Sequence, residues 1–398
     1  MLEKRRDDRQ ARLERTEKSW RFCVVDSGLA SSNPAFMLRR RLLCSIPAVL
    51  TAGARMNASI LTNRRLGLVI YSYSQRWMGR YSSVRVPPFK DVLDVFDHAR
   101  SIGIGGLQVG QEGWSRELAK EVRSTCESYD MRLEGMIRLP QAAGDVERFT
   151  RELRLGQEAG ATLFRTTLGG RRYEVFSRRE DYEMWYSQAL RSLEWAEPIA
   201  RRLKVKIAVE NHKDLETSEL LRVMQKLASQ HVGVCLDTGN SLALLEHPLE
   251  VVQSLAPYAL TVHLKDLAVS LADQGFQMAE VPLGKGVLPL ESMVNILRKE
   301  SPQAAFYLEM ITREPLLIPC LEETYWATFD QKSGRDLARI LAWVRGHQKA
   351  ALPAFDSLSQ EAKLALEEKN ITESLGFAAQ MLDFPQTQVM KAVREEER

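Results

Sequence analysis

Four residues of types that bind metal ions each end a short apolar run of the sequence. The runs are VKIAVE, HVGVCLD, LTVH and AFYLE, and they end at Glu210, Asp237, His263 and Glu309. Each residue alone could be an ordinary loop cap, but a buried carboxylate without a partner is costly. Because the carboxyl ends of parallel barrel strands lie on one face, four such residues on consecutive strands are expected to converge. We predict that they hold one divalent metal ion, which would neutralise Asp237.

The ligand types narrow the choice of metal and suggest a reaction. Three carboxylates and one imidazole suit Mn²⁺, Mg²⁺ or Co²⁺ better than Zn²⁺. A metal that chelates a carbonyl and the neighbouring hydroxyl acidifies the carbon-bound proton between them. One ligand carboxylate removes that proton and another returns one, as general base and general acid. Return on the other face gives epimerisation, and return at the adjacent carbon gives aldose–ketose isomerisation.

Other polar residues near these strand ends are candidates for substrate binding. His212 and Lys265 each lie two positions after a predicted ligand, Glu210 and His263, and so share that strand face. We expect His212 to contact the substrate, with structural support as its alternative role. Lys265 is expected to bind a substrate carboxylate, phosphate or carbonyl oxygen, unless it forms a salt bridge with a local acid. Arg165, in LFRTTLGG, could face the mouth of the site or form an ion pair.

Short apolar runs alternate with longer helical patterns from residue 66 onward. The runs that we expect to be strands span 66–74, 103–110, 131–137, 161–170, 205–212, 231–240, 260–266 and 305–310. Segments between them, such as DVLDVFDHARSI, repeat apolar residues at helical spacing. This alternation predicts an α/β fold, a (β/α)₈ TIM barrel over 61–350. A doubly wound open sheet is the alternative, but no G-x-G-x-x-G follows the first run, so a dinucleotide fold has little support.

Three segments late in the chain need separate interpretation. The loop after the seventh expected strand, 267–286, is long and punctuated by Gly and Pro, which suggests a hinge or lid over the site. The pattern GRDLARILAWVRGH, 334–347, is expected to be the last barrel helix. Residues 351–398 contain further helical pattern, and we predict a C-terminal helical extension of unknown role.

A set of short motifs resembles a known family. VENHKD, GVCLDTGN, TVHLKD, PLGKG and YLEM together are similar to the sugar phosphate isomerase/epimerase superfamily, with its xylose isomerase-like TIM barrel. The resemblance covers residues 66–350 and implies one divalent metal held by Glu210, Asp237, His263 and Glu309. In the family's ketose 3-epimerases, the glutamates that match Glu210 and Glu309 exchange the proton on opposite faces of a metal-bound enediolate.

The sequence departs from those epimerases at two places. Asn240 stands where many of them have a histidine, and Lys265 stands near the place of an arginine that they carry soon after the His263 position. Asn240 stays a candidate for substrate binding. The leading hypothesis is a metal-dependent isomerase or epimerase of a sugar or sugar derivative. The alternative is a lyase, a dehydratase or decarboxylase that acts on a keto-acid sugar derivative in the same metal site.

Two further classes of function can be weighed from the sequence. Endonuclease IV-like enzymes share this barrel but use a histidine-rich cluster of metals, whereas only His212 and His263 of the six histidines stand at strand ends on that side. Residues 1–65 hold 14 Lys and Arg against six Asp and Glu, so the remaining chain is net acidic and nucleic acid is not an expected partner. A non-catalytic binder is distinguished by isotope exchange, because it would leave the substrate's carbon-bound proton in place in D₂O.

Residues 1–60 resemble a leader that we exclude from the fold. MLRRRLLCSIPAVLTAGA, Met37–Ala54, has the basic, apolar and A-x-A parts of a signal peptide, with the adjacent arginines of twin-arginine signals. It predicts export to the periplasm, and a cytoplasmic location if the segment is not a signal. No apolar run reaches the roughly 18 residues that span a bilayer, so no stable membrane insertion is expected. Analogy with related barrels suggests a homo-oligomer.

Overall fold

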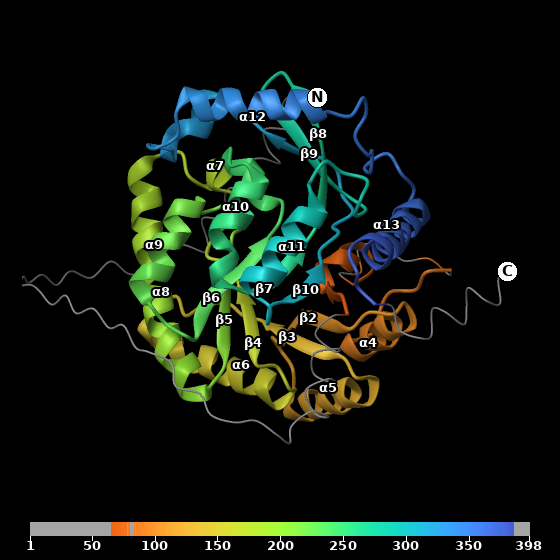
Figure 1. Ribbon diagram of the computed structural model, residues 1–398. Coiled ribbons are helices and arrows are strands. Elements are labelled where there is room, and N and C mark those ends of the chain that lie inside the picture. Colours follow the sequence, from red (N-terminus) through yellow and green to blue (C-terminus); the bar gives the residue numbers. More distant parts are fainter. Residues whose placement is uncertain (1–64, 78, 80–82, 84, 386–398) are drawn as a thin grey trace, which may run out of the picture. The chain divides into compact units, whose positions relative to one another are not determined.

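Eight parallel strands close into a barrel in the described part of the chain (Figure 1). The computed structural model describes residues 65–385, except 78, 80–82 and 84, so the predicted leader over 1–60 lies outside it. The order around the barrel is β1-β10-β7-β6-β5-β4-β3-β2, and every adjacent pair is parallel. The strands are β1 (Gly67–Val69), β2 (Gly106–Gly110), β3 (Arg132–Met136), β4 (Leu163–Thr166), β5 (Lys206–Glu210), β6 (Val232–Asp237), β7 (Ala259–Leu264) and β10 (Ala305–Leu308). The prediction of a (β/α)₈ barrel is confirmed.

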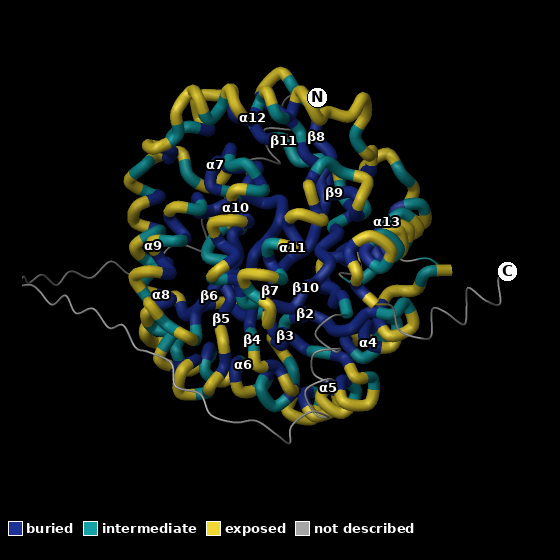
Figure 2. Tube along the Cα trace, in the orientation of Figure 1, coloured by how far each residue is buried: buried dark blue, intermediate teal, exposed yellow. Residues whose placement is uncertain are grey.

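Amphipathic helices surround the strands and bury one face against them. α5 shows the pattern: Ala119, Val122 and Cys126 are buried at helical spacing, and the Ser115 side chain caps its first turn by accepting from Leu118 N–H. Figure 2 shows the strands buried and the outer helix faces exposed. The helices that follow barrel strands are α4 (Val92–Ser101), α5 (Arg116–Tyr129), α6 (Val146–Glu158), α8 (Arg179–Leu203), α9 (Thr217–Leu227), α10 (Pro248–Leu255) and α11 (Leu290–Glu300), with short α3 (Ser74–Trp77) and α7 (Arg172–Val175).

A second, antiparallel sheet follows β7, where the sequence suggested a lid. β8 (Asp266–Ala272) and β9 (Gly275–Val281) form a hairpin, and β11 (Leu316–Ile318) pairs with β9. The expectation of a long loop over 267–286 is therefore wrong for 267–281, which is a paired hairpin, and a hinge or lid role for the segment stays a prediction. Gly275 has φ of +147°, and a Cβ there would lie 2.3 Å from the Ile318 carbonyl oxygen. Alternating apolar residues on both sides of the DQG turn were the missed signal of this hairpin.

α12 (Gly334–His347) packs mainly on this second sheet, with its strongest strand contacts to β8 and β9 (Figure 1). The expectation that 334–347 forms the last barrel helix is therefore wrong. A helical pattern shows which face is apolar, but it does not show which sheet that face covers.

The helix in the predicted C-terminal extension lies beside the barrel. The side chain of Glu367 in α13 (Gln360–Met381) accepts from the backbone N–H groups of Gln75 and Arg76, just after β1. The rings of Phe384 and Phe306 on β10 lie 5.3 Å apart, edge to face. α13 thus covers the barrel between β10 and β1, the place of the eighth helix, as Figure 1 shows between α11 and α4. The division into a barrel over 61–350 and an extension over 351–398 stays a prediction.

Candidate metal centre

The four predicted metal ligands converge at the C-terminal ends of four neighbouring strands. Glu210 ends β5, Asp237 ends β6, His263 is the second-last residue of β7, and Glu309 follows β10. Each offers one donor atom, and these four atoms all lie within 4.8 Å of one another. All four side chains are buried. The barrel register brings them together, since Asp237 and His263 are direct neighbours on paired strands.

The His263 ring is oriented so that one nitrogen faces the carboxylates. Its Nε2 lies 2.8 Å from Oε1 of Gln108, which fixes the ring. Its Nδ1 lies 3.6 Å from carboxylate oxygens of Glu210 and Glu309 and 3.9 Å from Oδ2 of Asp237. This buried Nδ1 has no hydrogen-bond partner. A buried polar atom is rarely left unpaired, and the three oxygens around it are hard ligands. The residues present therefore fit a divalent cation.

The Asp237 carboxylate is held by the turn that follows its strand. Its Oδ1 accepts from the backbone N–H groups of Gly239 and Asn240 at 2.9 and 2.8 Å. Its Oδ2 makes no hydrogen bond, although Nζ of Lys265 lies 2.9 Å away. The TGN turn after VCLD therefore fixes one oxygen and aims the other at the candidate site.

Two cations keep the glutamates of this centre ionised. Burial alone would raise the pKa of Glu210, but the guanidinium of Arg165, in direct contact, holds it below its usual range. Burial would also raise the pKa of Glu309, but Lys265, whose Nζ lies 2.6 Å from Oε2, holds it well below its usual range. Both glutamates are thus charged acceptors at neutral pH.

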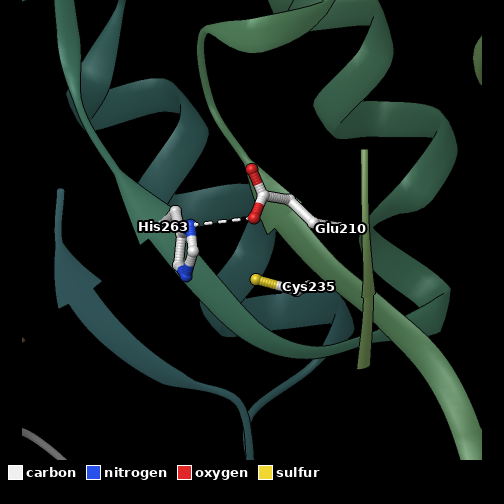
Figure 3. Close-up of side chains that lie close together, drawn as sticks. All are labelled: Glu210, Cys235 and His263. Atoms are coloured by element: carbon white, nitrogen blue, oxygen red, sulfur yellow. Dashed lines mark ion pairs between the residues drawn. The ribbon is translucent and has the colours of Figure 1, made fainter. Parts of the chain in front are cut away.

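Cys235 lies close to this centre. Figure 3 shows its sulfur below Glu210 and His263, and one donor atom from each of the three lies within the same 4.8 Å limit. Burial raises the pKa of the Cys235 thiol to about 11, so it is a neutral thiol beside Glu210 and His263.

The predicted substrate-binding residues line one small cavity beside the centre. Its volume is about 230 Å³. Its lining residues are Tyr71, Arg165, Arg171, Glu210, His212, Lys213, Asn240, Lys265, Glu309, Ile311 and Arg313. His212, Lys265, Asn240 and Arg165 are all among them. Their role in substrate binding stays a prediction.

Three of the predicted substrate contacts have further features in the cavity. Lys265 pairs with the two ligand carboxylates described above and not with Asp266, whose carboxylate accepts from backbone N–H groups. Arg165 lines the cavity and also forms an ion pair with Glu210. Burial and Lys213 lower the pKa of His212 to about 3, so its ring is neutral, and its Nδ1 has no hydrogen-bond partner.

Several residues at this centre were not predicted from the sequence. Lys213 and Arg313 line the cavity, and Gln108 on β2 holds His263. Lys213 follows His212 in VENHKD. The two-residue period of a strand does not select Lys213, and that period no longer applies there because the strand has already ended. Gln108 is a polar residue within an apolar strand. Its buried amide between Leu107 and Val109 was a signal from which its role could have been predicted.

A larger cavity lies elsewhere in the described residues and contains no predicted ligand. Its volume is about 580 Å³, and residues near the N-terminal ends of the strands, such as Arg132 and Lys206, line it. Sites of parallel barrels lie at the C-terminal ends of the strands. We therefore assign the chemistry to the smaller cavity.

The closed parallel barrel places the buried candidate metal ligands at the C-terminal ends of its strands. These two features together define the class of proteins to which the chain belongs. The chain belongs to the xylose isomerase-like TIM barrel family, whose family model matches residues 96–341. The family predicted from VENHKD, GVCLDTGN, TVHLKD, PLGKG and YLEM is thereby confirmed.

Individual relatives are more distant. The 3-oxo-isoapionate decarboxylase of Pectobacterium atrosepticum is 29% identical over 113 residues, 28% of this chain and 41% of that protein. YihM of Escherichia coli K12 is 24% identical over 102 residues, 25% of this chain and 31% of that protein. The chain thus spans less than half the length of these relatives. The structure of D-psicose 3-epimerase in the presence of D-fructose aligns with 79% of this chain and 98% of that one, at 13% identity and a TM-score of 0.51, which shows the fold alone.

Proposed function

We propose that the protein is a divalent-metal-dependent isomerase or epimerase of a sugar or sugar derivative. The observation that carries the proposal is the convergence of Glu210 and Glu309 on the unpartnered Nδ1 of His263, at 3.6 Å from each carboxylate. Asp237 would complete the ligand set. One divalent ion, Mn²⁺, Mg²⁺ or Co²⁺ rather than Zn²⁺, would polarise a substrate carbonyl and acidify the neighbouring carbon-bound proton.

The protein's own residues would move the proton. Glu210 and Glu309 are both held ionised, so either can begin as the base that accepts the carbon-bound proton. The other would take a proton from water and return it to the carbon, and the first glutamate would then release its proton to water. Asn240 donates to Oε1 of Glu210 at 2.8 Å and Arg165 contacts Oε2, which fixes the orientation of that carboxylate. The other lining residues restrict the access of water to the reacting carbon.

Solvent isotope exchange tests this proposal. The full chain would be loaded with Mn²⁺ and incubated in D₂O with ketohexoses, ketopentoses and keto-acid sugar derivatives, followed by NMR of the substrate C–H signals. We expect exchange with at least one substrate, and a loss of about 100- to 10,000-fold in Glu309→Gln and Glu210→Gln. Glu246→Gln, a partly buried glutamate outside the cavity, is the matched control. Full exchange in Glu309→Gln would remove that residue from the mechanism.

A lyase acting in the same centre is the second candidate function. The observation that favours it is the set of cations around the cavity, among them Lys265 and Lys213, which suits a keto-acid substrate. The relative that is a 3-oxo-isoapionate decarboxylase by name supports it too. The same incubations separate the two, because a decarboxylase releases CO₂ and a dehydratase yields a product lighter by one water. Recovery of an isomer of unchanged mass would exclude both.

Location and assembly are separate proposals. No helix among the described residues is long and apolar enough to cross a membrane. We keep the proposal that Met37–Ala54 directs export and is removed. N-terminal sequencing of the periplasmic protein should then find a start near Arg55, whereas intact leader on cytoplasmic protein would contradict export. We also propose a homo-oligomer, which light scattering would test, with a small-molecule carbohydrate or keto acid and not nucleic acid as its partner.

A further inference from the structure

Lys213 is a buried cation without an acidic partner. Its side chain is only 3% exposed. Its Nζ donates to Oδ1 of Asn240, a neutral amide, and no carboxylate forms an ion pair with it in the described part of the chain. An ammonium buried without a counter-charge is costly. Burial and Lys265 accordingly lower the pKa of Lys213 to about 8.

The neighbouring cations of the cavity differ from Lys213, because each has a carboxylate of its own. Arg165 contacts Glu210, Lys265 contacts Asp237 and Glu309, and Arg313 makes two hydrogen bonds to Glu280 at 3.1 and 2.7 Å. Together, the positive charges of Lys213 and these three cations balance the negative charges of the carboxylates just named before any metal ion binds. A divalent ion held by the predicted ligands would leave this group with excess positive charge. The substrate is the remaining source of negative charge.

The position of Lys213 defines where that negative charge would lie. Lys213 and Lys265 both approach Oδ1 of Asn240, the latter at 3.5 Å, so the two ammonium groups flank one amide. Lys265 also touches Asp237 and Glu309. An anion that replaces the amide oxygen at Lys213 would therefore lie next to the metal ligands and close to the reacting carbons.

We propose that Lys213, with Arg313 at the mouth of the cavity, binds a carboxylate on the substrate near its reacting carbonyl group. This inference rests on the proposed function and specifies it: the substrate is a sugar acid, not a neutral sugar. Both residues line the cavity beside Glu210 and Glu309. A phosphate at the far end of a sugar chain fits less well, because the cavity holds about 230 Å³ and the unpaired charge of Lys213 lies at Asn240, beside Lys265 and its metal-ligand carboxylates.

Binding of three probe sugars tests the proposal. The Mn²⁺-loaded full chain would be titrated calorimetrically with D-fructose, 2-keto-D-gluconate and D-fructose 6-phosphate, which carry no anion, a carboxylate beside the ketone and a distal phosphate. We expect 2-keto-D-gluconate to bind most tightly. Lys213→Gln should weaken its binding about 10- to 100-fold and weaken D-fructose binding far less, since only the sugar acid loses a charge-assisted hydrogen bond. Lys332→Gln, a lysine paired with Glu216 outside the cavity, is the control.

The other outcomes have distinct meanings. D-fructose binding at least as tightly as 2-keto-D-gluconate would overturn the carboxylate site, as would equal weakening of both in Lys213→Gln. If D-fructose 6-phosphate binds most tightly and its binding depends on Lys213 to the same extent, the anion that Lys213 binds is a distal phosphate and not a carboxylate. Arg313→Gln, nearer the surface, gives the same comparison if Lys213→Gln fails to fold. Failure of the proposed function itself appears separately, as absence of Mn²⁺ binding or of proton exchange with any sugar.

Discussion

Replacement of Gln108 by methionine should weaken metal binding through its effect on His263. Gln108 accepts at 2.8 Å from Nε2 of His263 and donates at 2.9 Å to Oε2 of Glu134, which also accepts from Thr261. The nitrogen assignment follows from this network, because a donor at Nε2 leaves the lone pair of Nδ1 for a metal. Methionine keeps the size of the side chain and removes both hydrogen bonds.

The size of the effect follows from burial at this position. Gln108 and His263 have no measurable exposure, so water cannot replace the lost contacts. Loss of an outer partner of a ligating histidine costs about 10- to 100-fold in metal affinity, or about 1.4–2.7 kcal/mol. Two buried groups also lose a partner, at about 1–3 kcal/mol each in the free energy of unfolding. Glu134 keeps its contact with Thr261, so its share should be the smaller.

A matched variant separates this effect from general damage to the core. Gln111→Met makes the same change at another buried glutamine, whose amide has no hydrogen-bond partner. Mn²⁺ affinity would be measured by competition with a chelating dye, and stability by urea denaturation. Gln111→Met should bind Mn²⁺ like the wild type and be no less stable. A Gln108→Met dissociation constant within twofold of the wild type would refute the reasoning.

Stability predictions follow from two other features of the fold. Burial raises the pKa of Glu367 from its ordinary 4.5 to about 7, so the contribution of Glu367 to stability falls as pH rises from 4.5 through 7. Relative to Glu367→Gln, the wild type should lose about 2–3 kcal/mol between pH 5 and pH 8 in urea denaturation, and a constant difference would contradict this. Gly156→Ala places a Cβ 2.4 Å from Phe164 and should cost about 1–3 kcal/mol. Gly376→Ala has open space and should gain about 0.5–1 kcal/mol, and equal melting temperatures for these two helix variants would refute the packing argument.

The barrel could be predicted because its signals are local and repeated. Each strand is a short apolar run, and the strand-end positions of Glu210, Asp237, His263 and Glu309 follow once the strands are parallel. The second sheet was missed because β8 and β9 follow β7 after a single residue, Lys265, within what a barrel treats as a loop. The placement of α12 and α13 depends on tertiary contacts, such as Phe384 against Phe306, that no local pattern contains.

The candidate centre was predictable in its ligands but not in its charge balance. Lys265 and Arg165 were named as candidates, yet their pairing with specific carboxylates depends on side-chain directions across five strands. Lys213 could not be separated from any other loop lysine by sequence, because its significance is the absence of an acidic partner among the described residues. The nearness of Cys235 to Glu210 depends on the register of β5 and β6, which no local pattern contains.

Metal content per chain is the most direct test of the central claim. The full chain, Asp237→Asn and the control Asp214→Asn, which alters a buried acid outside the ligand set, would be purified without metal-binding tags and analysed by mass spectrometry for Mn, Mg, Co and Zn. We predict about one divalent ion per chain in the wild type and the control, and none in Asp237→Asn. A wild type that holds no ion after reconstitution, or an Asp237→Asn variant that holds as much as the wild type, would contradict the account.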